Sequence, residues 1–194
     1  MKRIGSALIV VLLACPGQSP PPGDEQMGRY TFRAEPIGGL PDACTFVEIP
    51  DGGFSFEAAF SRFRDAGLYY VTIGGVAHEA TWDGQRISAT YSAQRNFSQC
   101  GCAGGSTVVT TMRETLSATV VSRSQSEAAG GCVDNPPVDL DAGIVPPNST
   151  SEGGFDAVRA CGTLGEEVTT NVQVPCFTQC NFCQLRYTIQ GERR

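Results

Sequence analysis

The nine cysteines are the side chains of this 194-residue chain that are best suited to chemistry. Three of them lie close together near the end of the chain, at Cys176, Cys180 and Cys183, and Cys100 is separated from Cys102 by a single residue. Thiols at such spacings can ligate a zinc ion, act as a redox pair or form disulfides. The compartment in which the chain folds decides between these alternatives.

The first 15 residues have the layout of an export signal. Lys2 and Arg3 precede an apolar run, and a stretch rich in Pro, Gly and Ser follows Cys15. The run is about ten residues long, whereas a membrane-spanning helix needs roughly 20. The segment Leu12-Leu13-Ala14-Cys15 resembles the lipobox of bacterial lipoproteins.

This resemblance implies that residues 1–14 are removed, that Cys15 is linked to diacylglycerol, and that its new amine is acylated, for example with palmitate. Pro16 stands where lipoproteins retained in the inner membrane have Asp, so the resemblance implies the outer membrane of a Gram-negative cell. Three acyl chains exceed the two signals that stable anchoring requires. The membrane is therefore one expected partner, reached through the lipid.

Export through an oxidising envelope favours disulfides for the other eight cysteines. The sequence leaves their connectivity open, although two cysteines separated by one residue have poor geometry for a bridge to each other. The alternatives are a zinc site on Cys100, Cys102, Cys180 and Cys183, or a redox pair of Cys180 and Cys183. We assign to disulfides Cys44, Cys100, Cys102, Cys132, Cys161, Cys176, Cys180 and Cys183.

The charge balance excludes several classes of function. The net charge is −6, and it becomes −8 once Lys2 and Arg3 leave with the signal. An acidic chain without a basic cluster is a poor candidate for nucleic-acid binding. Lys2 is the only lysine and His78 the only histidine, which excludes Schiff-base, P-loop and His-rich zinc sites. We expect no metal, no cofactor and no catalysis, with a carboxylate-pair hydrolase as an alternative.

Short alternating runs separated by turn residues predict an antiparallel all-β domain from Tyr30 onward. Asp83-Gly84 and Gly74-Gly75 are two-residue hairpin signals. The first predicts His78 opposite Ala89, and the second predicts it opposite Val71. Both hairpins place the same apolar side chains on an inner face. In a closed barrel this face would line a ligand pocket, made of Tyr69, Val71, His78, Trp82 and Tyr91.

The flanking segments extend this pattern. Phenylalanines at 54, 56 and 60 alternate with polar residues, and a four-residue loop at 64–67 would keep them inside. Residues 107–123 contain no Gly or Pro and predict one long strand, or two strands with a corner. A long acidic loop rich in Pro and Gly is predicted at 128–154, followed by short strands near 168–174 and 183–189.

The predicted organisation is a signal peptide at 1–14, a lipidated Cys15 with a flexible tether at 15–28, and a single β domain at 29–194. Its fold is an antiparallel meander that closes as a barrel or folds as a sandwich and is stabilised by disulfides. We expect a non-catalytic structural or interaction role at the membrane surface, with an envelope protein as partner. Binding of a small ligand inside a barrel is the alternative.

Overall fold

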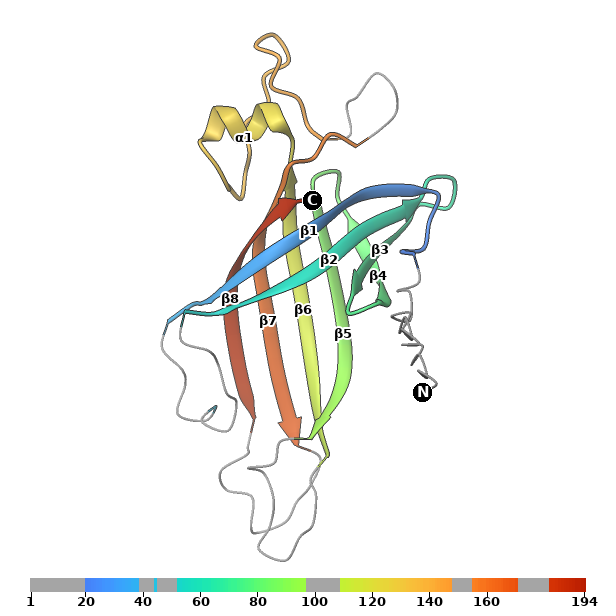
Figure 1. The fold of residues 1–194 in the computed structure, drawn as a ribbon, viewed down its shortest axis with the longest axis vertical. Coiled ribbons are helices and arrows are strands. Elements are labelled where there is room, and N and C mark those ends of the chain that lie inside the picture. Colours follow the sequence, from blue (N-terminus) through green and yellow to red (C-terminus); the bar gives the residue numbers. More distant parts are fainter. Residues whose placement is uncertain (1–19, 39–43, 45–51, 97–108, 148–154, 171–181) are drawn as a thin grey trace, which may run out of the picture.

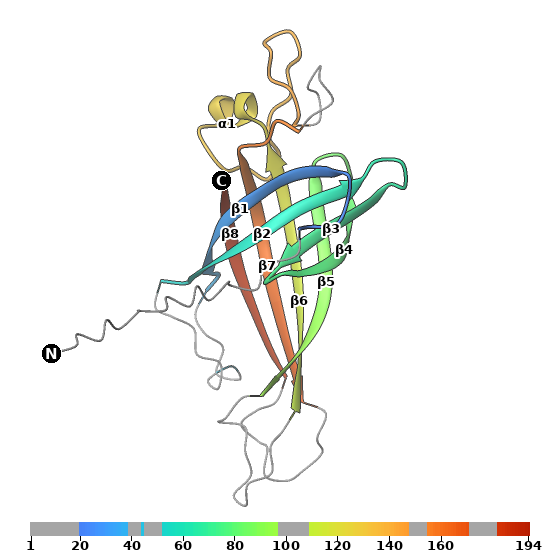
Figure 2. The ribbon, with the colours of Figure 1, turned by 45° about the vertical axis from the view of Figure 1, so that its right-hand side comes forward.

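The computed structural model describes residues 20–38, 44, 52–96, 109–147, 155–170 and 182–194. They form a closed barrel of eight antiparallel strands with one short helix at one end (Figures 1 and 2). This confirms the predicted antiparallel meander and selects the barrel over the sandwich. The lipobox, with Cys15, lies outside the described residues. Four of the cysteines assigned to disulfides also lie outside them: Cys100, Cys102, Cys176 and Cys180.

Each strand pairs with the next one along the chain, and β8 closes the barrel against β1. This order needs only hairpin connections, because every pair is antiparallel. The elements are β1 (Glu25–Pro36), β2 (Phe54–Phe63), β3 (Leu68–Ile73), β4 (Val76–Trp82), β5 (Arg86–Asn96), β6 (Val109–Val121), α1 (Arg123–Ala129), β7 (Arg159–Thr170) and β8 (Cys183–Arg193).

Two of the predicted hairpin registers are confirmed. Val71 lies opposite His78 across the Gly74-Gly75 turn. Phe63 pairs with Leu68, so the connection between β2 and β3 is the predicted four-residue loop. Both glycines of the β3–β4 turn have positive φ (58° and 83°), which is the conformation that the two central residues of a type I′ turn require.

The predicted register between β4 and β5 is wrong by two residues, because Ala80 pairs with Ala89. The backbone N–H of Asp83 donates to the Arg86 carbonyl (3.2 Å), so the central turn residues are Gly84 and Gln85. Only Gly84 has positive φ (106°) in this turn, as the first central position of a type II′ turn requires. A shift of two residues leaves every side chain on its predicted face, and it brings His78 level with Tyr91.

Backbone N–H groups of the β4–β5 turn converge on the Asp83 carboxylate. Those of Arg86 (2.7 Å) and Gln85 (3.0 Å) both donate to Oδ1 of Asp83. These two hydrogen bonds hold the pKa of Asp83 below its usual range. The carboxylate therefore fixes the turn at this position and with it the observed register.

Three boundaries differ from the predictions. The barrel begins at Glu25, so the first four residues of β1 belong to the segment predicted as a tether. A bulge between Gln26 and Gly28 interrupts the alternation of buried and exposed side chains there, which is why the strand was not predicted. A single strand, β6, occupies most of 107–123, and α1 follows it and enters the predicted loop. β7 begins at Arg159, nine residues before the predicted strand.

The barrel interior beside α1 is filled with apolar side chains. Tyr30, Phe32 and Phe60 are fully buried there and their rings contact one another, at centroid distances of 5.0–6.0 Å. Each buried ring of this size stabilises the fold by roughly 2–3 kcal/mol through the hydrophobic effect. The same layer contains Val71, Ile87, Leu116, Val120 and Ile189.

Candidate functional site

The structure separates the five residues predicted to form a ligand pocket into two groups. Val71 is fully buried, and the Tyr69 ring stacks on Trp82 with a centroid distance of 6.2 Å. The edge of Trp82 meets Phe155 at 5.8 Å, so these residues pack within the filled part of the barrel. His78 and Tyr91 are half-buried, as are Tyr69 and Trp82, but their rings contact each other.

His78 and Tyr91 belong to a layer of polar side chains inside the barrel. Their rings stack at a centroid distance of 4.0 Å. Tyr91 pairs with Glu114 across β5 and β6, and Glu114 pairs directly with Glu166 across β6 and β7. Residues that pair directly present their side chains on the same face of the sheet. The hydroxyl of Tyr187, on β8, donates to Oε2 of Glu166 (3.1 Å). We call these five residues the polar layer.

Buried apolar side chains flank the polar layer on both sides along the barrel. On β6, Glu114 lies between Met112 and Leu116, which are 7% and 0% exposed. On β7, Glu166 lies between Leu164 and Val168 in the same alternation, and both of these are buried. Two carboxylates that face each other inside a sheet destabilise it by like-charge repulsion. Positions of this kind are candidates for a functional role.

The polar layer is half-open because β4 separates from β5 at its level. The ladder between the two strands ends at the pair Ala80–Ala89. Beyond this pair, His78 and Tyr91 contact each other through their rings without a backbone ladder, and Val76 is 58% exposed. His78, Tyr91, Glu114 and Glu166 accordingly keep partial contact with solvent, whereas Tyr187 is buried.

The electrostatics of the layer favour a neutral histidine and a protonated tyrosine. Burial raises the pKa of Tyr187, and the negative charges of Glu166 and Glu114, with the hydrogen bond to Glu166, raise it further. Burial lowers the pKa of His78, and the charge of Glu114 opposes this in part. The layer therefore combines two glutamates with a protonated Tyr187 and a His78 ring whose burial favours the neutral form.

No family model, curated protein or solved structure gives a significant match to this chain. The polar layer must be interpreted from its own residues. Within the described part of the chain, no group of three or more His, Cys, Asp or Glu side chains is arranged to hold a metal ion. No helix in the described part of the chain is long and apolar enough to cross a membrane.

The titration of His78 tests the geometry of this layer. Because burial favours the neutral ring, we expect its pKa to lie below 6.5, the ordinary value for histidine. Glu114→Gln should lower this pKa further, since it removes the one negative charge that favours the imidazolium. NMR titration of the imidazole signals measures both effects, and the assignment is unambiguous because the chain has one histidine.

The sign of the pH dependence follows from the same shift. The folded protein disfavours the imidazolium, so His78 contributes most stability above pH 6.5, and this contribution falls as the pH drops below 6.5 toward the folded pKa. A His78 titration midpoint above pH 6.5 would contradict the burial of its ring. An upward shift of this midpoint in Glu114→Gln would contradict the proximity of Glu114 to His78.

Three residues of the polar layer were not predicted from the sequence, although the sequence pattern indicates that two of them face inward. Glu114 shares the alternation of Met112 and Leu116, which marks it as inward-facing. Tyr187 occupies the corresponding position in the predicted strand near 183–189. Glu166 had no such signal, because the strand was predicted to begin after it.

The described disulfides join distant parts of the chain. Cys44 is bonded to Cys183, and Cys132 is bonded to Cys161. Four of the eight cysteines therefore form disulfides, as predicted, and the structure adds which cysteine pairs with which. The disulfide of Cys183 with Cys44 contradicts the alternatives in which Cys183 is a zinc ligand or the redox partner of Cys180.

Three hollows lined by described residues lie outside the barrel interior. One of about 520 Å³ lies beside α1 and is lined by charged side chains, among them Arg123, Arg159 and Glu192. Hollows of about 450 and 100 Å³ lie against the outer faces of β2–β3 and β6–β8. None of the three is lined by a residue of the predicted pocket.

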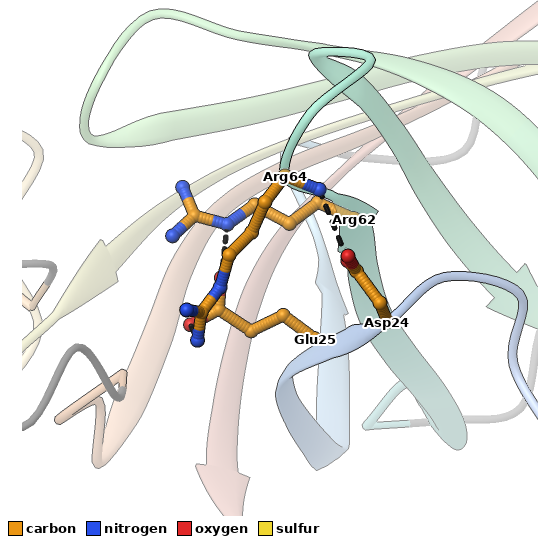
Figure 3. A network of polar contacts seen from close by, with 4 residues as sticks. All are labelled: Asp24, Glu25, Arg62 and Arg64. Carbon is orange, nitrogen blue, oxygen red and sulfur yellow. Dashed lines mark hydrogen bonds and ion pairs between the residues drawn. The ribbon is translucent and has the colours of Figure 1, made fainter.

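A network of charged groups holds the edge of the barrel where β1 begins (Figure 3). The Glu25 carboxylate is 6% exposed and forms ion pairs with Arg62 and with Arg64 (3.0 Å to the second). The backbone N–H of Arg64 donates to Oδ1 of Asp24 (3.0 Å). The Arg62 guanidinium also lies over the Phe155 ring, 5.8 Å from its centroid. Every charge in this network has a partner, so we assign it a structural role.

Proposed function

We propose that this protein is a non-catalytic lipoprotein of the cell envelope, anchored through Cys15 in the outer membrane, whose barrel binds a small cationic molecule in the polar layer. The observation that carries the proposal is the direct pairing of Glu114 with Glu166 between buried apolar neighbours on an inner wall. The lipobox resemblance supports the anchor and the location.

The chemistry of the layer fits a positively charged group. Two carboxylates supply charge-assisted hydrogen bonds, and aromatic faces attract cations through their quadrupole. Tyr91 offers such a ring beside Glu114. Since a small eight-stranded barrel has room for at most one small ligand, an organic amine or quaternary ammonium group is the expected class.

The same pair fits hydrolysis less well. Glycoside hydrolases place two carboxyl groups on either side of the bond that breaks. Glu114 and Glu166 are neighbours on one wall, which favours joint binding of one positive charge. Turnover of an envelope glycan that is lost in Glu166→Gln would instead support the hydrolase.

The proposal predicts a charge-dependent affinity. Benzyltrimethylammonium should bind the full-length protein in detergent more tightly than an uncharged analogue of the same shape, and Glu114→Gln or Glu166→Gln should each weaken its binding by roughly tenfold. Isothermal titration calorimetry measures both comparisons. The matched control is Glu79→Gln on β4, whose side chain is exposed on the outside of the same barrel and should leave the affinity unchanged.

Equal affinity for the charged and uncharged probes would refute a cation site. A tenfold loss in Glu79→Gln as well would show that the probe responds to overall charge and not to the polar layer. Native mass spectrometry of protein extracted gently from membranes then identifies any molecule that remains bound, and its charge gives an independent check.

A second candidate function uses the segment between α1 and β7. Ser122 Oγ donates to the Val145 carbonyl (2.6 Å), and Gln125 Nε2 donates to that of Pro137 (3.2 Å). These contacts tie residues 137–145 to the start of α1, and Val138 and Leu140 are 55% and 71% exposed. A fixed surface loop with an exposed apolar side chain suits contact with an envelope protein. Loss of a cross-linked partner in Leu140→Asp would support this candidate.

A further inference from the structure

The described chain begins very close to the proposed anchor. Five Cα–Cα steps separate Cys15 from Pro20, and a fully extended chain spans at most about 17 Å over that length. The sequence predicted a tether of residues 15–28, which would have allowed the domain to turn freely. Because residues 20–24 lie on the barrel, the freedom of the domain above the bilayer is much smaller.

Residues 20–24 fold back over the outer face of β2 and β3. The backbone N–H of Asp24 donates to the Arg62 carbonyl (3.1 Å), and Pro21 is buried. A Cβ on Gly23 would lie 2.4 Å from the Arg62 carbonyl oxygen, so this approach requires glycine, which also has φ of 108°. Pro21 lines the hollow of about 450 Å³ together with Thr72, Ile73, Gly74 and Gly75. The chain therefore leaves the barrel beside the β3–β4 turn.

Exposed apolar side chains lie on the outer face of the same two strands, β2 and β3. Phe63 and Leu68 are each 39% exposed and pair with each other at the β2–β3 turn. The Tyr70 ring meets Phe63 edge-on, with centroids 6.0 Å apart. We call these three residues the hairpin patch. Residues 20–24 cross the same outer face beside this patch.

We infer that the hairpin patch is a membrane-contact surface, so that the barrel lies with β2 and β3 against the bilayer. The inference rests on the lipid anchor of the proposed function. An anchor at most about 17 Å from Pro20 holds the outer face of β2 and β3, and the patch on it, toward the headgroups, where aromatic and aliphatic side chains enter the interface favourably. The polar layer then opens, between β4 and β5, near the edge of this surface.

Tryptophan reporters in the full lipidated protein test this orientation. Phe63→Trp places a reporter in the patch on β2, and Thr163→Trp places one on the exposed face of β7, three strands away around the barrel. Both variants keep Trp82, whose signal is measured in the unmodified protein and subtracted. In vesicles containing brominated phosphatidylcholine, the Phe63→Trp reporter should be quenched about twofold or more relative to the Thr163→Trp reporter.

The outcomes separate the anchor from the orientation. Mass spectrometry of the mature N-terminus reports the lipid, and a protein without it would refute the anchor and the inference together. A lipidated protein with equal quenching of both reporters would overturn the orientation alone. A Phe63→Trp reporter protected from both brominated lipid and aqueous acrylamide would place a second protein on the patch and would also overturn it. Leu68→Trp repeats the measurement should Phe63→Trp fail to fold.

Discussion

Replacing Glu25 by glutamine is expected to lower the free energy of unfolding by about 3 kcal/mol. The carboxylate is 6% exposed and is shared by Arg62 and Arg64. Glutamine has nearly the same shape but no charge, so it leaves the largely buried Arg62 guanidinium without its anionic partner. Breaking a buried pair from one side is costly because the remaining charge stays desolvated. Equilibrium unfolding in urea measures the difference.

The matched control is Glu35→Gln, in the same strand. Glu35 forms an ion pair with Arg33, but both side chains are more than half exposed. Surface pairs of this kind stabilise a protein by less than about 1 kcal/mol, so the control should change the unfolding midpoint little. Equal effects of the two substitutions would mean that the network in Figure 3 contributes no more than an ordinary surface pair.

The effect of Glu25→Gln should depend on pH in one direction. Burial alone would raise the pKa of Glu25, but the hydrogen bonds and charges of Arg62 and Arg64 outweigh it and hold the pKa below 4.5. A carboxyl group with a lowered folded pKa stabilises the protein above its unfolded pKa, and this contribution disappears as the pH falls through the folded pKa. The difference between the variant and the unmodified protein should therefore be constant above about pH 5 and shrink below pH 4.5.

A double substitution distinguishes the loss of the Glu25–Arg62 ion pair from the cost of leaving the Arg62 charge without a partner. Glu25→Leu combined with Arg62→Met removes both charges and keeps similar volumes, so it should recover part of the stability lost in Glu25→Gln. Full recovery is not expected, because the Arg62 guanidinium also lies over the Phe155 ring. A double variant less stable than Glu25→Gln would show that packing against Arg62, and not its charge, dominates the network.

Alternation and turn chemistry carried most of the fold prediction. The inner face of β3 and β4 was predictable because two glycine-containing turns constrained the same strand from both ends. The two-residue error in the β4–β5 register arose from the turn. Asp83-Gly84 fits the central positions of a type I′ turn, but the Asp83 carboxylate accepts hydrogen bonds from two backbone N–H groups after it, and the central positions are Gly84 and Gln85 instead. The faces survived the error because the side-chain period in a strand is two.

The missed elements lacked a pattern that hydrophobic periodicity can detect. β7 begins with Arg159 and contains glycines at 162 and 165, and a Cβ on Gly162 would lie 1.9 Å from the Ser117 carbonyl oxygen. This glycine is required by the close approach of β6 and β7, which is visible only in three dimensions. The helix α1 had a readable start in the capping box of Ser122 and Gln125, but at seven residues it has too few turns for a periodic signal.

The candidate site was predictable only in part, for a related reason. His78 and Tyr91 were placed on the inner face correctly, and the observed register then put their rings in contact. The pairing of Glu114 with Glu166 depends on the register between β6 and β7, and no turn residue in the sequence fixes that register. Long-range pairing of this kind follows from closing the barrel, which a linear pattern does not specify.

The disulfide between Cys132 and Cys161 gives the second large expected effect. Replacing both cysteines by serine should lower the free energy of unfolding by about 3.5 kcal/mol, because the bridge closes a loop spanning 29 residues of the unfolded chain. Two serines are preferred to one, since a single substitution would leave a free thiol to exchange with other disulfides. Unfolding in guanidinium chloride under non-reducing conditions measures the loss, and Asp134→Ser, an exposed position beside the bridge, is the control.

The bridge should also determine where stability is lost. It joins the segment after α1 to β7, next to the hydrogen bond from the Thr119 hydroxyl to the Asp134 carbonyl (3.2 Å). Hydrogen exchange in the double variant should therefore increase first in residues 130–147, while the β3–β4 hairpin, which lies outside the closed loop, should keep its protection at low denaturant. Uniform loss of protection would show that the segment and the barrel unfold as one unit. In that case the bridge would stabilise the whole barrel, and the segment would be unsuited to act as an independent contact surface.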